Sequence, residues 1–273
     1  MRWKFVGLAS IIAVLAPAAG LTAEAVTPPL PSSMAAIGDS ITQAFDVCCW
    51  YGEHPSKSWS TGNDGTDVIL SHFERIKAVN PAMAGHGSND SVTGANMADA
   101  PGQAAAAVAQ QASYVTILMG ANDVCTSSPA TMTSTDVFRS QFDATLQTLE
   151  AGLPPDAHIF VSSIPNVFQL WKTLHNSGWA QSVWFAAQIC QSMLSPFNTR
   201  SDRRAVLDRE RAFNDILAQE CAAYANCRFD GYATFNYSFT AQQVSTLDFF
   251  HPSISGQKIL AQITWQASWW PSV

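Results

Sequence analysis

Short apolar runs alternate along this chain with longer segments in which apolar residues recur at helical spacing. The apolar runs predict strands at 35–38, 114–119 and 157–163, and short strands are also expected at 89–94 and 228–232. The helical patterns predict helices at 68–78, 98–112, 134–153, 201–224 and 253–268. Because strands that alternate with helices are typical of parallel sheets, the pattern predicts an α/β fold, a three-layer α/β/α sandwich with its active residues at the carboxyl ends of the strands.

The stretch 35–46 (AAIGDSITQAFD) is expected to run from a strand through a tight turn at Ser40 into a short helix. At such a turn, free backbone N–H groups and the dipole of the helix favour developing negative charge, which suits a nucleophilic serine. A serine in this position can equally serve only as the cap of the helix. The polar residues elsewhere in the chain must decide between these two interpretations.

The first 25 residues have the parts of a secretory signal peptide: two basic residues near the start, an apolar run at 5–15 and a small-residue cleavage site at 23–25. The mature chain is expected to begin near Val26, and residues 26–273 are expected to form one domain. No later stretch reaches about 18 uncharged apolar residues, so no transmembrane segment is expected. The sequence therefore predicts a protein secreted to the periplasm or the exterior.

The chain is acidic and has an even number of cysteines. Its 14 Lys and Arg face 21 Asp and Glu, a net charge of −7; without residues 1–25 the counts are 12 and 20, a net charge of −8. That balance argues against nucleic acid as a partner. Six cysteines in an exported chain favour disulfides, and no spacing resembles a metal site. Cys221 and Cys227 are the easiest pair to close. The sequence leaves open the three possible pairings of Cys48, Cys49, Cys125 and Cys190.

Residues 165–200 lack a clear period and contain six aromatic residues. The segment is therefore expected to be an aromatic-rich insertion rather than a plain connector. Its aromatic side chains either line a cap over a substrate or pack a helical insertion onto the core. For most of them the packing role is favoured.

Three polar blocks follow predicted strands or precede the last helix: GDS at 38–40, GAND at 120–123 and DFFHP at 248–252. Hydrolysis by a serine needs a base, an acceptor that orients the base, and donors for the oxyanion. The spacing of Asp248 and His251 allows one imidazole nitrogen to contact the carboxylate while the other reaches Ser40. Asp39 and Asp123 are expected to hold loop backbone by hydrogen bonds. Structural or surface roles are expected for the other histidines, His54, His72, His86, His158 and His175.

With these blocks in this order, the chain resembles the SGNH hydrolases, the GDSL esterase and lipase superfamily, over the whole domain. Ser40 matches the family's nucleophile, Asn122 its oxyanion asparagine, and Asp248 with His251 its Asp-x-x-His-Pro block. The first block reads GDSI instead of GDSL, a volume-conserving change behind the nucleophile.

The resemblance also implies a glycine whose N–H faces the oxyanion. Gly94 in NDSVTGA fits the family's second block, and Gly85 in NPAMAG has the same spacing and remains a rival. Gly94 is preferred because the run that follows it continues the family-like pattern. The oxyanion donors implied are then Ser40, Gly94 and Asn122.

The family's fold has a five-stranded parallel sheet with flavodoxin-like strand order. Its activity implies a serine hydrolase that cleaves carboxylic esters through an acyl-enzyme, with no cofactor and no metal, and the expected signal peptide makes it a secreted one. The substrate could be a lipid, a short-chain acyl ester or an O-acetylated carbohydrate, and the chain is expected to act as a monomer. The alternative is a non-catalytic protein that binds glycans or lipids on the same fold.

Overall fold

A computed structural model describes residues 1–3, 27–66 and 68–273. The expected signal peptide falls almost entirely on residues 4–26, outside the described part of the chain. The central layer is a parallel sheet with the order β2-β1-β3-β4-β5, which confirms the predicted fold class. Its strands are β1 Met34–Gly38, β2 Gly87–Asn89, β3 Tyr114–Leu118, β4 His158–Val161 and β5 Cys227–Phe229.

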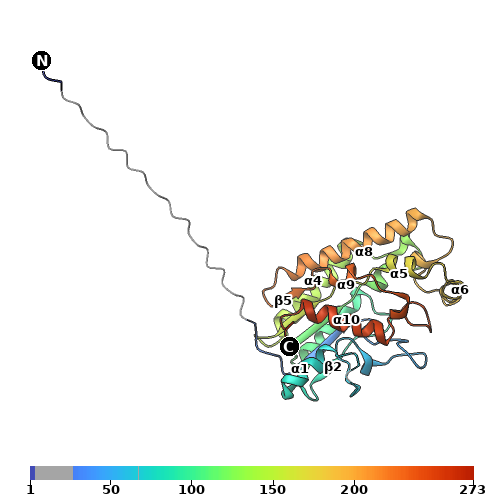
Figure 1. Cartoon of the computed structure of the whole chain (residues 1–273), viewed down its shortest axis with the longest axis horizontal. Coiled ribbons are helices and arrows are strands. Elements are labelled where there is room, and N and C mark those ends of the chain that lie inside the picture. The colour runs from blue at the N-terminus through green and yellow to red at the C-terminus, as the bar shows by residue number, and fades with distance from the viewer. Residues whose placement is uncertain (4–26, 67) are drawn as a thin grey trace.

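Helices cover both faces of this sheet (Figure 1). The α-helices are α1 His72–Val79, α2 Ala100–Ala109, α3 Ala121–Val124, α4 Thr135–Gly152, α5 Val167–Leu174, α6 Gly178–Ala186, α7 Gln191–Leu194, α8 Arg200–Cys221, α9 Ala233–Asn236 and α10 Ile254–Ala267. Short 3-10 helices occur at η1 Pro55–Lys57, η2 Pro81–Met83, η3 Met97–Asp99, η4 Pro129–Thr131 and η5 Ala241–Gln243. None of the described helices has both the length and the apolar character needed to span a bilayer.

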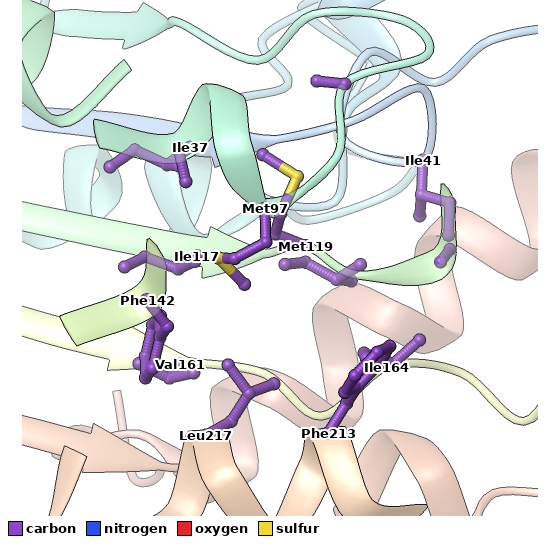
Figure 2. Close-up of a cluster of buried hydrophobic side chains, with 14 of the residues drawn as sticks. Ile37, Ile41, Met97, Ile117, Met119, Phe142, Val161, Ile164, Phe213 and Leu217 are labelled. Atoms are coloured by element: carbon purple, nitrogen blue, oxygen red, sulfur yellow. The ribbon is translucent and has the colours of Figure 1, made fainter. Parts of the chain in front are cut away.

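The larger core lies between the sheet and helices α2, α4 and α8. Ile37, Ile117 and Val161 lie opposite one another on β1, β3 and β4, and all three are fully buried. Figure 2 shows these side chains in one cluster with Phe142 of α4 and Leu217 of α8. Because side chains alternate across a strand, this row fixes which residues point to the opposite face.

The opposite face of the sheet packs against α1 and α10. Met34, Tyr114 and Phe160 alternate with the residues of the first row and form a second cluster with Phe73 of α1 and Trp265 of α10. The predicted helices therefore sit on both sides of the sheet, as a three-layer sandwich requires.

Local capping shifts two helix boundaries from their predicted positions. The predicted helix 68–78 begins only at His72, because Ser71 caps it and exchanges hydrogen bonds with Glu74 in a capping box. The predicted helix 98–112 is α-helical only as α2. Its chain turns left-handed at Gln111, where φ is 52°, and a right-handed helix cannot continue through that residue.

Two sequence predictions in the first half of the chain are wrong. Residues 40–46 form consecutive hydrogen-bonded turns instead of a helix, because Ala44 and Asp46 have φ of 50° and 53°. The strand expected at 89–94 ends at Asn89; the chain beyond it is a loop whose Asp90 and Val92 N–H groups still donate to the carbonyls of Ala36 and Gly38 in β1. The serine at position 40 therefore has no helix dipole behind it.

The aromatic-rich insertion folds into α5, α6 and α7. Trp184 of α6 is buried and donates from its indole N–H to the carbonyl of Phe249, whereas Trp179 remains 78% exposed. The Cys125–Cys190 disulfide fastens this insertion to the segment after α3. The other disulfides are the predicted Cys221–Cys227 pair and a bond between the adjacent residues Cys48 and Cys49.

Candidate active site

The three polar blocks meet at the carboxyl edge of the sheet. Ser40 follows β1, and Asn122 lies in α3 directly after the neighbouring strand β3; Asp248 and His251 belong to the loop before α10. In this strand order the connections diverge between β1 and β3, which is where open α/β sheets bind ligands. A cleft of about 390 Å³ lies there, and Ser40, Gly94, Asn122, Asp248 and His251 all border it.

A chain of hydrogen bonds joins three of these residues. His251 Nε2 lies 2.7 Å from Ser40 Oγ, and its Nδ1 contacts Asp248 Oδ2. The other carboxylate oxygen of Asp248 accepts the backbone N–H groups of Phe250 and His251 at 2.8 and 3.1 Å. With Nδ1 donating to the carboxylate, Nε2 is the nitrogen free to accept the proton of the serine hydroxyl.

The loop that carries Asp248 and His251 is held at both ends. Ser245 N–H donates to the carbonyl of His251 at 2.8 Å, and Val244 pairs with Pro252 in an isolated bridge. Ser253 then caps α10, so the turn and the helix fix the imidazole position together.

Three residues that border the cleft have N–H groups available as donors. Within the described chain, the N–H groups of Ser40 and Gly94 donate to no protein acceptor. One hydrogen of the Asn122 amide is used by the carbonyl of Ala95 at 2.8 Å, and the second is left for a ligand. Gly94 has φ of 83°, a left-handed conformation that glycine adopts without strain.

The rival glycine lies elsewhere. Gly85 precedes β2 and borders a separate hollow with Ser33 and His86, at the amino edge of the sheet. Gly94 is thus the glycine that the structure brings together with Ser40 and Asn122.

Two buried carboxyl groups support the loops of Ser40 and Asn122. Asp39 accepts the Ile41 N–H at 2.9 Å, and Asp123 accepts the Met97 N–H at 2.9 Å, so both hold loop backbone as expected. Complete burial raises the pKa of Asp39 to about 6, and burial also raises the pKa of Asp123. Each keeps one oxygen without a hydrogen-bond partner in the described part of the protein.

A smaller apolar hollow of about 60 Å³ adjoins the cleft. Phe250 borders both spaces. Ile41, Ala121 and Pro252 also border the hollow, and they are the chain neighbours of Ser40, Asn122 and His251. An apolar group bound there would thus lie close to the reacting atoms.

Sequence reasoning missed several residues that border the cleft. Asp46 comes from the turns after Ser40, and Val183 and Ile189 come from the insertion. Of the two predicted roles, Trp184 has the packing role because it is buried, and the residues of the insertion that border the cleft are not aromatic. An aromatic-rich segment was the only signal for this wall, and it does not say which side chains face inward.

A parallel α/β/α sandwich with serine, histidine and aspartate hydrogen-bonded at its carboxyl edge has the architecture of the SGNH-type hydrolases. Residues 34–264 match the family model described as GDSL-like lipase/acylhydrolase, and the chain belongs to this family. Membership places it among the ester hydrolases of the GDSL type.

Two solved structures show the same fold. An acetyl xylan esterase aligns with a TM-score of 0.52 at 14% identity, over 86% of this chain and 98% of that chain. An extracellular lipase from Streptomyces rimosus aligns with a TM-score of 0.52 at 14% identity, over 86% of this chain and 99% of that one. No curated protein matches the sequence significantly.

Proposed function

We propose that this protein is a secreted serine esterase that cleaves carboxylic esters through an acyl-enzyme. The observation that carries the proposal is the hydrogen-bond chain from Ser40 through His251 to Asp248 on the wall of an open cleft. Disulfides among all six cysteines favour an oxidising compartment, in keeping with the expected signal peptide. We expect the mature chain to act as a single-domain monomer.

In the proposed mechanism, Ser40 Oγ attacks the ester carbonyl while His251 Nε2 takes its proton. Asp248 orients the imidazole and stabilises the imidazolium, and the N–H groups of Ser40 and Gly94 with the Asn122 amide bind the tetrahedral oxyanion. His251 then protonates the leaving alcohol. Water, deprotonated by the same imidazole, hydrolyses the acyl-enzyme and regenerates Ser40. The cycle needs no cofactor or metal.

The adjoining hollow favours short acyl chains over long ones. The hollow measures about 60 Å³, which leaves little room for a long chain. We therefore propose short-chain acyl esters as substrates in place of long-chain lipids. A panel of p-nitrophenyl esters should show a higher kcat/KM for short acyl chains than for long ones. A maximum at long chains would contradict this assignment.

A carbohydrate O-acetyl esterase is the second candidate. Tyr51 borders the cleft with 77% of its surface exposed, beside Trp50 at 66%, and exposed aromatic rings of this kind suit the faces of sugars. Release of acetate from acetylated xylan, measured beside the p-nitrophenyl series, compares the two candidates directly.

Labelling with a fluorophosphonate separates an esterase from a non-catalytic binding protein. Only an activated serine reacts with the probe, so we expect labelling of the wild type and none of Ser40→Ala. A wild-type protein that stays unlabelled while binding glycans or lipids would favour the binding protein.

A further inference from the structure

A second carboxyl group, that of Asp46, lies beside Asp248 at the border of the cleft. Asp46 is fully buried, and its side chain lies within hydrogen-bonding range of Asp248. It reaches this place because the turns after Ser40 end there: its N–H donates to Gly52 at 2.8 Å, and its carbonyl accepts the hydroxyl of Ser245 from the loop of His251. Asp46 thus connects the two loops that carry the nucleophile and the base.

The hydrogen-bond partners of the two carboxyl groups differ. Asp248 accepts three N–H donors, two from backbone and one from His251 Nδ1. Asp46 accepts one, from Gly52 at 2.8 Å, and its Oδ2 has no N–H or hydroxyl partner among the described residues. Two ionised carboxylates cannot hydrogen-bond to each other, because both only accept. A proton on one of them turns the contact into a hydrogen bond.

The surroundings of the two carboxyl groups favour a proton on Asp46 over one on Asp248. Three donors stabilise the charged form of Asp248, whereas burial disfavours a charge on Asp46. Burial is the largest cause that raises the pKa of Asp46, and the negative charge of Asp248 raises it further; Gly52 and the charge of His251 act in the opposite direction.

We propose that Asp46 is a positioning residue that holds its proton and donates a hydrogen bond to Asp248. The resulting chain is Asp46–Asp248–His251–Ser40. The O–H of Asp46 restrains the carboxylate that aims the imidazole, and the neutral acid adds no second negative charge beside it. This inference rests on the proposed esterase function.

Two substitutions at Asp46 test the proposal by steady-state kinetics across pH. Asp46→Ala removes the donor, and we expect kcat to fall about tenfold to a hundredfold with little change in KM, because the base is less well aimed. Asp46→Asn keeps a neutral donor, and we expect it to recover most of that loss and to leave the acid limb of the pH profile in place.

Glu210→Gln is the matched control. Glu210 is also a fully buried acid: one oxygen accepts a backbone N–H, from Val167 at 3.1 Å, the other is unpartnered in the described chain, and burial raises its pKa. It lies on α8, outside the cleft. We expect this variant to change the melting temperature without a change in kcat or in the acid limb.

Two results would overturn the proposal. Wild-type kcat in Asp46→Ala would reduce Asp46 to a structural residue. An acid limb that moves about half a pH unit or more towards acid in Asp46→Asn would show that Asp46 is ionised, because an ionised neighbour favours protonated His251.

Infrared spectroscopy tests the proton without turnover. The difference between wild type and Asp46→Asn at neutral pH should contain the carbonyl stretch of one protonated carboxyl group. If that band is present in a protein that hydrolyses no ester, the proposed function fails and the protonation survives. If it is absent in an active esterase, the proposal about Asp46 fails alone.

Discussion

His72 and His251 each lie between two oxygen-bearing side chains, at different places in the fold. His72, in the core between α1 and α10, contacts the hydroxyl of Tyr114 at 2.8 Å and that of Thr264 at 2.9 Å. His251, on the cleft, contacts a carboxylate on one side and the Ser40 hydroxyl on the other. Burial without a countercharge lowers the pKa of His72 to about 3, so this imidazole stays neutral at physiological pH.

The sites of His72 and His251 differ in the hydrogen-bond partners of the imidazole. Two hydroxyls satisfy the hydrogen-bonding groups of a neutral imidazole and provide no negative charge that would stabilise its protonated form. Such a pair of partners suits a structural core. A carboxylate on Nδ1 stabilises the imidazolium that forms when Nε2 removes a proton, which suits a base. The same residue type thus stabilises the fold in one place and is assigned to the chemistry in the other.

The largest expected effect is the loss of activity when His251 of the cleft or its partner Ser40 is replaced. Ser40→Ala and His251→Ala should each lower esterase activity by about 10⁴-fold or more, because either change removes the unit that generates the nucleophile. The double variant should be hardly worse than either single one. Steady-state rates on p-nitrophenyl acetate measure this, with melting temperatures close to wild type as the control. A wild-type rate in Ser40→Ala would remove this serine from the mechanism.

The core histidine should control acid stability. The pKa of His72 lies near 3 in the folded state and near 6.5 in the unfolded chain, so its neutral form stabilises the fold fully above pH 6.5. That contribution, up to about 5 kcal/mol, is lost as pH falls from 6.5 to 3. Urea unfolding across this range should show a smaller acid-induced loss in His72→Gln than in wild type.

His86→Gln serves as the control for this measurement, because His86 is exposed. An acid profile of His72→Gln that coincides with that of His86→Gln would contradict the assignment of His72 as a buried neutral group.

Asn122 should affect turnover more than binding. Asn122→Ala is expected to lower kcat by about 10²–10³, or roughly 3–4 kcal/mol, because its amide meets the oxygen only when that oxygen is tetrahedral and charged. Asn122→Asp should be worse, since it places a negative charge against the oxyanion. The two variants are compared by kcat and KM on one soluble ester. If Asn122→Asp turns over like wild type, Asn122 only holds the turn.

The contribution of Asp39 to folding stability should change with pH in the direction opposite to that of His72, over the same pH range. The pKa of Asp39 is about 6 in the folded protein against an ordinary 3.8, so its contribution to stability is complete below pH 3.8 and is lost as pH rises to 6. The loss is at most about 3 kcal/mol. Asp39→Asn should remove this decline in urea unfolding between pH 4 and 7. An unchanged slope would mean that Asp39 is ionised at pH 5.

Most of the architecture could be predicted from the sequence, because strands β3 and β4 are continuous apolar runs and α4, α8 and α10 keep a helical period over many residues. The site blocks were equally readable, since each directly follows or precedes such an element. The turns at 40–46 could not be predicted, because nothing in the sequence indicates that a residue such as Ala44 adopts a left-handed conformation. Asp46 escaped notice for another reason: its partner Asp248 is remote in the chain, and only the fold brings the two together.

The Cys125–Cys190 disulfide has a consequence for how this protein can change over evolution. It closes a loop across a sequence separation of 65 that contains β4, α5 and α6, and such closure restricts the unfolded chain by about 4 kcal/mol. The cleft wall formed by Val183 and Ile189 is thereby fastened beside Asn122 independently of its own packing. Substitutions in this wall can alter which alcohol or acyl group fits while the loop stays in place. Because of this covalent bond, substitutions in the insertion can change substrate preference with little loss of folding stability.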